Sequence, residues 1–172
     1  MGSRKGLIAA FFIAVASLLA ASCSTDGCME NQSSLPLAGF YNSRTKASMP
    51  LDSIQVMGIG APGDSLLYTI GTRLTEVYLP FRATAGTTSY CFHYGYKALE
   101  SNAMNDTLTF HYTASPYFAG EECGAMYRYH IDRLTYTRHL IDSIKIVDSL
   151  ITNTATQQLN IFIATADEGA DK

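Results

Sequence analysis

The stretch Ser89-Tyr-Cys-Phe-His-Tyr-Gly-Tyr96 decides the fold class, because every second residue in it is aromatic. Side chains alternate between the two faces of a β-strand, so this spacing puts four rings on one face and leaves Cys91 and His93 on the other. Residues 107–113 repeat the pattern with Leu, Phe and Tyr at alternate positions. Both segments therefore predict strands with one face in a buried core.

The same alternation recurs along most of the chain after residue 36. In residues 76–82, Val77, Leu79 and Phe81 share one face. Further strand candidates are residues 38–42, 53–58, 66–70, 127–136, 141–148 and 159–164. Turn-forming runs separate the candidates at short spacing, at residues 61–64, 85–87, 102–106 and 119–121. Because short connections join antiparallel strands, the sequence predicts one antiparallel, β-sandwich-like, all-β domain of about 8–9 strands over residues 37–165.

Two segments depart from simple alternation. Residues 140–151 also fit helical spacing, but they are rich in β-branched side chains and precede the strand candidate 159–164, so we expect a β-hairpin there instead of a helix. Pro80 removes a backbone donor from the segment 76–82 and indicates a sheet edge or a bulge. Such an edge is either a pairing site for another chain or, more simply, an edge that Pro80 blunts.

The composition fits one globular domain and excludes several classes of protein. The 172 residues are 47% apolar and 16% charged, which excludes a disordered or collagen-like chain. Twelve Lys and Arg face fifteen Asp and Glu, and no basic run is present. This balance argues against a nucleic-acid-binding surface.

The first 22 residues have the pattern of an export signal. Arg4 and Lys5 precede an uncharged run, residues 7–21, that would span only about 22 Å as a helix, less than the ~30 Å of a bilayer core. The following Leu19-Ala-Ala-Ser-Cys23 resembles a bacterial lipobox, in which the Cys receives diacylglycerol. We therefore expect a lipoprotein signal peptide over residues 1–22 and lipidation at Cys23. The alternative is an ordinary secretory signal with Cys23 merely nearby.

Cleavage before Cys23 would leave a lipid-anchored chain of 150 residues. Ten Lys and Arg then face fifteen Asp and Glu, a formal charge of −5, which adds no attraction to anionic lipid. Residues 23–36 are polar and predict a tether, and residues 166–172 predict a flexible C-terminus. We expect a place in the cell envelope, on the outer membrane of a Gram-negative bacterium, with membrane lipid and an envelope protein or glycan as partners.

Three thiols remain if Cys23 carries lipid. In an oxidising compartment we expect two of them to pair. Cys28 in the tether and Cys123 in the loop 120–124 both lie in flexible segments, which favours a Cys28–Cys123 disulfide. A Cys91–Cys123 pair is the alternative.

Signals for catalysis or metal binding are weak. Cys91 and His93 share a strand face, as a nucleophile and its base or two metal ligands would, but His111, His130 and His139 are scattered singly. Half-exposed strand histidines are the simpler interpretation. We therefore predict no enzyme, cofactor or metal site, and a role in binding or scaffolding. An assembly or adhesion subunit that pairs along a sheet edge is the first alternative, and a Cys/His metal protein or hydrolase is the second.

A repeated tripeptide and the tyrosines add two further hypotheses. Five of the nine Asp precede Ser or Thr and then an aliphatic residue, a pattern that resembles O-glycosylation sites of Bacteroidota-type bacteria. The same tripeptide closes turns, so both interpretations stand. Most of the eleven Tyr fall in strand patterns, where half-buried sheet positions are a simpler interpretation than a platform for sugars or peptides. The candidate glycosylation sites are Ser53, Ser65, Thr107, Ser143 and Ser149.

Short motifs spread over most of the mature chain carry a family resemblance. They are Cys23 followed by Cys28, Val77-Tyr78-Leu79-Pro80-Phe81, Thr87-Thr88-Ser89-Tyr90, Glu122-Cys123-Gly124, Ile144-Lys145-Ile146, and Asn153 before Leu159-Asn160-Ile161-Phe162-Ile163. The layout resembles small, uncharacterised Bacteroidota lipoproteins classed as a domain of unknown function. The resemblance implies an envelope lipoprotein with a β domain and Cys28 and Cys123 as its cysteine pair. It implies no activity, and Cys91 departs from the pattern.

Overall fold

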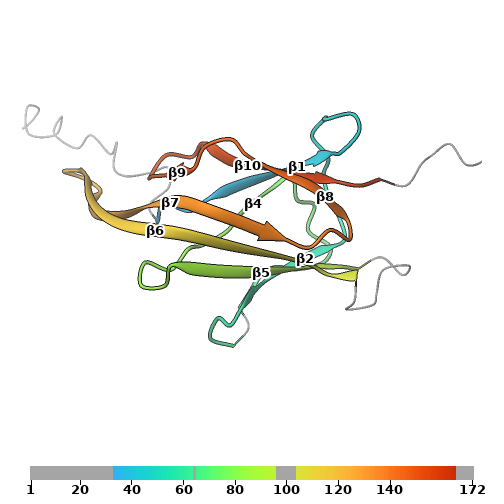
Figure 1. Cartoon of the computed structure of the whole chain (residues 1–172), viewed down its shortest axis with the longest axis horizontal. Coiled ribbons are helices and arrows are strands. Elements are labelled where there is room, and N and C mark those ends of the chain that lie inside the picture. The colour runs from blue at the N-terminus through green and yellow to red at the C-terminus, as the bar shows by residue number, and fades with distance from the viewer. Residues whose placement is uncertain (1–32, 64, 96–103, 166–172) are drawn as a thin grey trace, which may run out of the picture.

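The computed structural model describes residues 33–63, 65–95 and 104–165. Within these residues the chain forms ten strands in two sheets that lie one above the other (Figure 1), so the expected all-β, sandwich-like domain is confirmed. The strands are β1 (Leu37–Asn42), β2 (Ile54–Ile59), β3 (Leu66–Tyr68), β4 (Glu76–Tyr78), β5 (Thr87–Tyr94), β6 (Asp106–Gly120), β7 (Gly124–Tyr136), β8 (Ile141–Ile146), β9 (Leu150–Ile151) and β10 (Gln157–Ile163).

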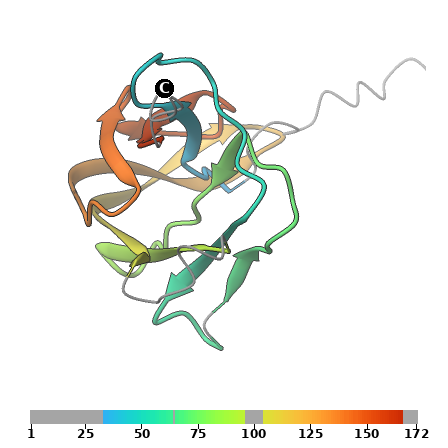
Figure 2. The same cartoon turned by 90° about the vertical axis from the view of Figure 1, so that its right-hand side faces the viewer.

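One sheet has four strands in the order β4-β1-β10-β8, and the other has six in the order β3-β2-β5-β6-β7-β9. In the view turned by 90° (Figure 2), β2 and β3 lie in one layer and β1 and β10 in the other. The expectation of purely antiparallel pairing is wrong at one place, because β1 and β10 run parallel, with Phe40 opposite Ile161. This pair joins the two ends of the described chain at the centre of the four-stranded sheet, where both strands are largely buried.

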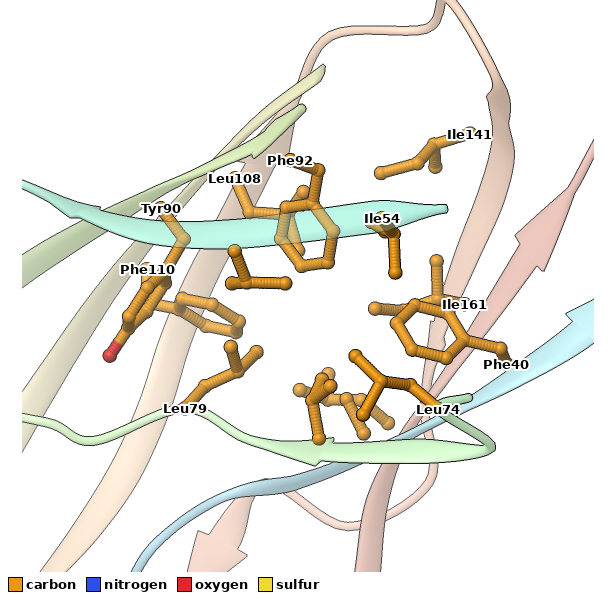
Figure 3. Close-up of a cluster of buried hydrophobic side chains, with 14 of the residues drawn as sticks. Phe40, Ile54, Leu74, Leu79, Tyr90, Phe92, Leu108, Phe110, Ile141 and Ile161 are labelled. Carbon is orange, nitrogen blue, oxygen red and sulfur yellow. The ribbon is translucent and has the colours of Figure 1, made fainter. Parts of the chain in front are cut away.

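The alternating aromatic residues form the core, as the sequence predicts. Tyr90, Phe92 and Tyr94 of β5 are at most 2% exposed and face the four-stranded sheet. There the rings of Phe40 and Phe92 pack edge to face, with their centroids 6.4 Å apart (Figure 3). The alternate residues of β6 are buried in the same layer. Each fully buried ring or aliphatic side chain contributes about 1.5–3 kcal/mol, so this layer supplies much of the stability of the domain. Tyr96 lies outside the described residues.

The strand expected over residues 76–82 ends early, at Tyr78. Leu79 still donates its N–H to the carbonyl of Pro36 at 2.9 Å, but the next residue, Pro80, has no N–H, and the chain leaves the sheet. The predicted face is nevertheless correct, since Val77, Leu79 and Phe81 are all buried. Sequence alternation therefore identified the buried side of this segment and overestimated the length of its strand.

β4 lies at an edge of the four-stranded sheet, as Pro80 indicates, but this edge offers little to another strand. Because Leu79 bonds toward β1, the N–H of the preceding Tyr78 points outward. That N–H donates to the hydroxyl of Tyr68 at 2.8 Å, and the next outward position is Pro80 itself. A continuous ladder cannot form here, which disfavours assembly by strand addition at this edge.

Residues 140–151 form strands and not a helix. β8 pairs antiparallel with β10, so the expected hairpin is confirmed, with Ile144 opposite Ile161. The connection contains the short strand β9, which alternation does not predict and which joins the other sheet, with Ile151 opposite Tyr129. β6 is also much longer than the expected residues 107–113, because it and β7 extend together to a turn at residues 121–123.

Asp106, at the start of β6, is fully buried and binds five donors. Its carboxylate accepts hydrogen bonds from the hydroxyls of Tyr94 at 2.8 Å and Thr137 at 2.9 Å. It also accepts three backbone N–H groups at 2.8–2.9 Å, from His139, Leu140 and Ile141. At these residues the chain passes from the six-stranded to the four-stranded sheet, so one carboxylate fixes the crossing.

We predict that Asp106→Asn destabilises the domain by on the order of 3 kcal/mol or more, because an amide replaces one of two accepting oxygens with a donor and leaves buried N–H groups unpaired. Urea denaturation followed by circular dichroism measures the change. Asp52→Asn is the matched control, since the side chain of Asp52 is 59% exposed. A loss at Asp106 no larger than that at Asp52 would contradict the role of this carboxylate.

Candidate functional site

Cys91 and His93 lie on the outer face of β5 and are half-buried, as expected. His93 Nδ1 bonds to the side-chain oxygen of Asn105 at 2.9 Å. The residues opposite Cys91 on the neighbouring strands are Met57 and Thr107. Burial raises the pKa of the Cys91 thiol, with smaller effects from Asn105 and Asp106, whereas a nucleophilic cysteine requires a lowered pKa.

The other histidines have separate partners. The ring of His111 contacts Thr87 and Arg133, and His139 contributes its backbone N–H to the crossing described above. No group of three or more His, Cys, Asp or Glu side chains that could hold a metal ion occurs among the residues that the structure describes. Among the described residues, no other histidine therefore joins Cys91 and His93 in a metal-binding group.

One chain of hydrogen bonds was not visible in the sequence. Ser149 Oγ lies 3.3 Å from His130 Nε2, and His130 Nδ1 lies 3.0 Å from Asp132 Oδ1. This order of groups is the one that serine hydrolases use. Sequence analysis missed it because Ser149 reaches His130 only through the pairing of β9 with β7, which no local pattern predicts.

The surroundings of this chain do not favour catalysis. The side chains of His130 and Asp132 are 56% and 49% exposed, and the hydrogen bond from His130, followed by one from Thr113, lowers the pKa of Asp132. In a hydrolase these groups act in a site from which water is excluded, since water weakens each electrostatic interaction. We interpret the three residues as a surface hydrogen-bond chain that fastens β9 to β7.

A preformed apolar pocket lies beside the segment that follows β4. It has a volume of about 250 Å³, and Arg82 is charged among the described residues of its lining. The hydroxyl of Tyr112 accepts the N–H of Arg82 and bonds to its carbonyl, both at 2.9 Å, and the hydroxyl of Tyr90 donates to the carbonyl of Pro80. The lining residues are Gly58, Ile59, Ala61, Pro62, Ser65, Leu67, Pro80, Phe81, Arg82, Thr88, Ser89 and Tyr90.

This pocket can receive a small apolar group. Phe81 forms part of its wall and is itself held by stacking on Tyr112, with ring centroids 4.1 Å apart and an angle of 8° between the planes. Side chains fixed in this way do not have to be ordered when a ligand binds, which favours affinity. The guanidinium of Arg82, which donates to the Thr87 carbonyl at 3.3 Å, places a positive charge beside it.

The five candidate glycosylation sites differ in access. Ser65 is exposed, in the turn between β2 and β3, and its hydroxyl donates to the Pro62 carbonyl at 3.1 Å. Ser53, Thr107, Ser143 and Ser149 are half-buried. The Asp that precedes Thr107 is the buried Asp106, so that copy of the tripeptide has a structural role.

Cys123 forms a disulfide, whereas Cys91 is a free thiol. The alternative Cys91–Cys123 pairing is therefore wrong, and the partner of Cys123 is not among the described residues. Cys23 and Cys28 both lie outside those residues, so lipidation at Cys23 and the Cys28–Cys123 pairing stay predictions.

The family of unknown function DUF6452 has a model that matches residues 53–163. The chain belongs to this family. The matched range runs from the start of β2 to the end of β10 and includes the pocket, the crossing at Asp106 and Cys123. It does not include β1, although β1 lies between β4 and β10 in the four-stranded sheet. No curated protein and no solved structure matches the chain.

We predict that the Cys91 thiol titrates at a higher pH than glutathione, because its burial disfavours the thiolate. The measurement is thiolate absorbance against pH in a secreted Cys23→Ala form of the protein, read as the difference from Cys91→Ser, which subtracts the ionisation of the eleven Tyr. A titration below that of glutathione would instead indicate an activated cysteine, and His93→Ala would then show whether His93 activates it.

Proposed function

We propose that this protein is a membrane-anchored envelope lipoprotein whose β-sandwich binds or scaffolds without catalysis. The order of segments along the chain carries the proposal. A positively charged start and the apolar run 7–21 lead to Cys23, a polar tether follows, and the chain joins the sandwich at the buried Ser34 and Pro36, inside the expected tether 23–36 and just before β1. This order is typical of a domain held at a membrane by lipid on its first mature residue.

Acyl chains on Cys23 would be the attachment. Within the described residues, no helix has the length and apolarity needed to cross a bilayer. A diacylated and N-acylated cysteine supplies more than the single chain that gives only marginal binding. We place the protein on the outer membrane of a Gram-negative bacterium, as in the Bacteroidota lipoproteins that its motifs resemble.

The apolar pocket beside Phe81 supports a binding role. The described residues of its lining other than Arg82 are uncharged, and its wall is fixed by tyrosine hydroxyls, so a small apolar group of an envelope component fits it without rearrangement. The raised pKa of Cys91 and the exposure of His130 support a role without catalysis. The buried Tyr90 and Tyr94 belong to the core, which disfavours a tyrosine platform for sugars.

Lipidation at Cys23 predicts both where the intact protein fractionates and the mass of its N-terminal peptide. Expressed with its own signal in a Gram-negative host, it should partition with membranes, and its N-terminal peptide should have the mass of acylated Cys23. Cys23→Ala should release it into the soluble envelope fraction. Membrane extraction and mass spectrometry check both, and a Cys23→Ala protein that remains with membranes would refute the anchor.

If the protein is O-glycosylated, Ser65 should have the highest occupancy, because it is the exposed site among the five. Glycopeptide mass spectrometry of protein from a Bacteroidota host measures the occupancy, with Ser65→Ala as the variant that should lose the glycan. Thr107→Ala is the matched control and should leave the total glycan mass unchanged. Equal glycan occupancy at Thr107 and Ser65 would show that exposure does not determine which site is modified.

A further inference from the structure

The far end of the β6–β7 hairpin presents one apolar face to solvent. The hairpin extends to one end of the molecule (Figure 1), and Phe118 there is 69% exposed and Tyr127 45% exposed. The strand register places Pro116 opposite Tyr127 and Phe118 opposite Ala125. Residues two apart on a strand and opposite across a pair share a face, so these four side chains form one surface, the hairpin face, and all four are exposed.

The other side of the hairpin end is fixed to the domain. The hydroxyl of Tyr117 accepts the N–H of Asn153 at 3.1 Å and donates to its side-chain oxygen at 3.0 Å. The Asn153 amide also contacts Cys123 Sγ at 3.7 Å, and the Arg128 guanidinium lies 5.9 Å from the centre of the Tyr117 ring. The hairpin face is therefore held in place before any partner binds.

The disulfide of Cys123 connects this same hairpin end to a cysteine outside the described residues. If Cys23 carries lipid, as proposed above, Cys28 is the thiol that remains for Cys123. Five residues of extended chain span at most about 18 Å, and the Cα atoms of a disulfide lie about 6 Å apart. Because the face begins at Ala125, two residues beyond Cys123, it lies within reach of the bilayer that holds the lipid.

We propose that the hairpin face of Pro116, Phe118, Ala125 and Tyr127 docks on the surface of the membrane in which Cys23 is anchored. Aromatic side chains with an apolar body, and Tyr with its polar tip, are enriched at the boundary between headgroups and acyl chains. Glu121 and Glu122 in the adjacent turn are exposed and negative, so the face suits zwitterionic lipid better than anionic lipid. The inference rests on the proposed lipid anchor.

The absence of Trp from the chain allows a direct test. Phe118→Trp in the full lipidated protein supplies the chain's single tryptophan, which is excited selectively over Tyr, and Leu66→Trp is the matched control. Leu66 is 46% exposed on β3, at the opposite edge of the six-stranded sheet from the β7–β9 side. Both variants are reconstituted into phosphatidylethanolamine and phosphatidylcholine vesicles, with and without brominated acyl chains.

Phe118→Trp should emit at shorter wavelength on vesicles and be quenched about twofold or more by brominated lipid, whereas Leu66→Trp should change little. Flotation distinguishes failure of the lipid anchor from failure of the hairpin face to dock. Protein that does not float with vesicles refutes the anchor itself. Protein that floats but shows equal, weak quenching at both positions overturns the docking of the hairpin face. A blue shift that depends on protein concentration and is insensitive to bromine identifies a second copy as the partner and also overturns it.

Discussion

The buried carboxylate of Asp106 is the interaction on which the rest of the domain depends. Its two oxygens bind Tyr94 of β5, Thr137 just after β7, and the N–H groups of residues 139–141 at the beginning of β8. A chain that crosses between two sheets must break its ladder, and its free N–H groups then need another acceptor. Burial, followed by the charge of Asp106, raises the pKa of Tyr94, which keeps its hydroxyl a donor to that carboxylate.

At each edge of the four-stranded sheet, a tyrosine hydroxyl accepts an outward-pointing backbone N–H. Tyr68 of β3 accepts the outward N–H of Tyr78 on β4, and Tyr136 of β7 accepts the N–H of Ile144 on β8 at 3.3 Å. Each ring packs against the core while its hydroxyl satisfies an edge of the opposite sheet. These two tyrosines therefore cap edges that would otherwise pair with another strand.

Sequence periodicity predicted the features that are determined within a single strand. Alternation identified the buried faces of β5 and β6 and the inward side of residues 76–82, because the side of a strand is set by its own sequence. It could not predict that β1 pairs in parallel with β10, or that β9 crosses to the other sheet, since neither choice changes the pattern within a strand. The Ser149–His130 contact was hidden for the same reason, and the burial that raises the pKa of Cys91 is likewise set by the packing of the sheet and not by the residues beside it in the chain.

A lipid anchor and a disulfide together would restrict the orientation of the domain more than the lipid alone. A lipid on Cys23 alone would leave the sandwich free to rotate about the tether, because the residues between Cys23 and the buried Ser34 are polar and rich in turn formers. A disulfide from Cys123 to Cys28 would add a second, short connection at the hairpin end, and the Tyr117–Asn153 bonds would pass its constraint to the loop before β10. With the apolar hairpin face turned to the bilayer, the domain would have one orientation, and the pocket beside Phe81, which is formed by different strands, would have a defined position relative to the membrane.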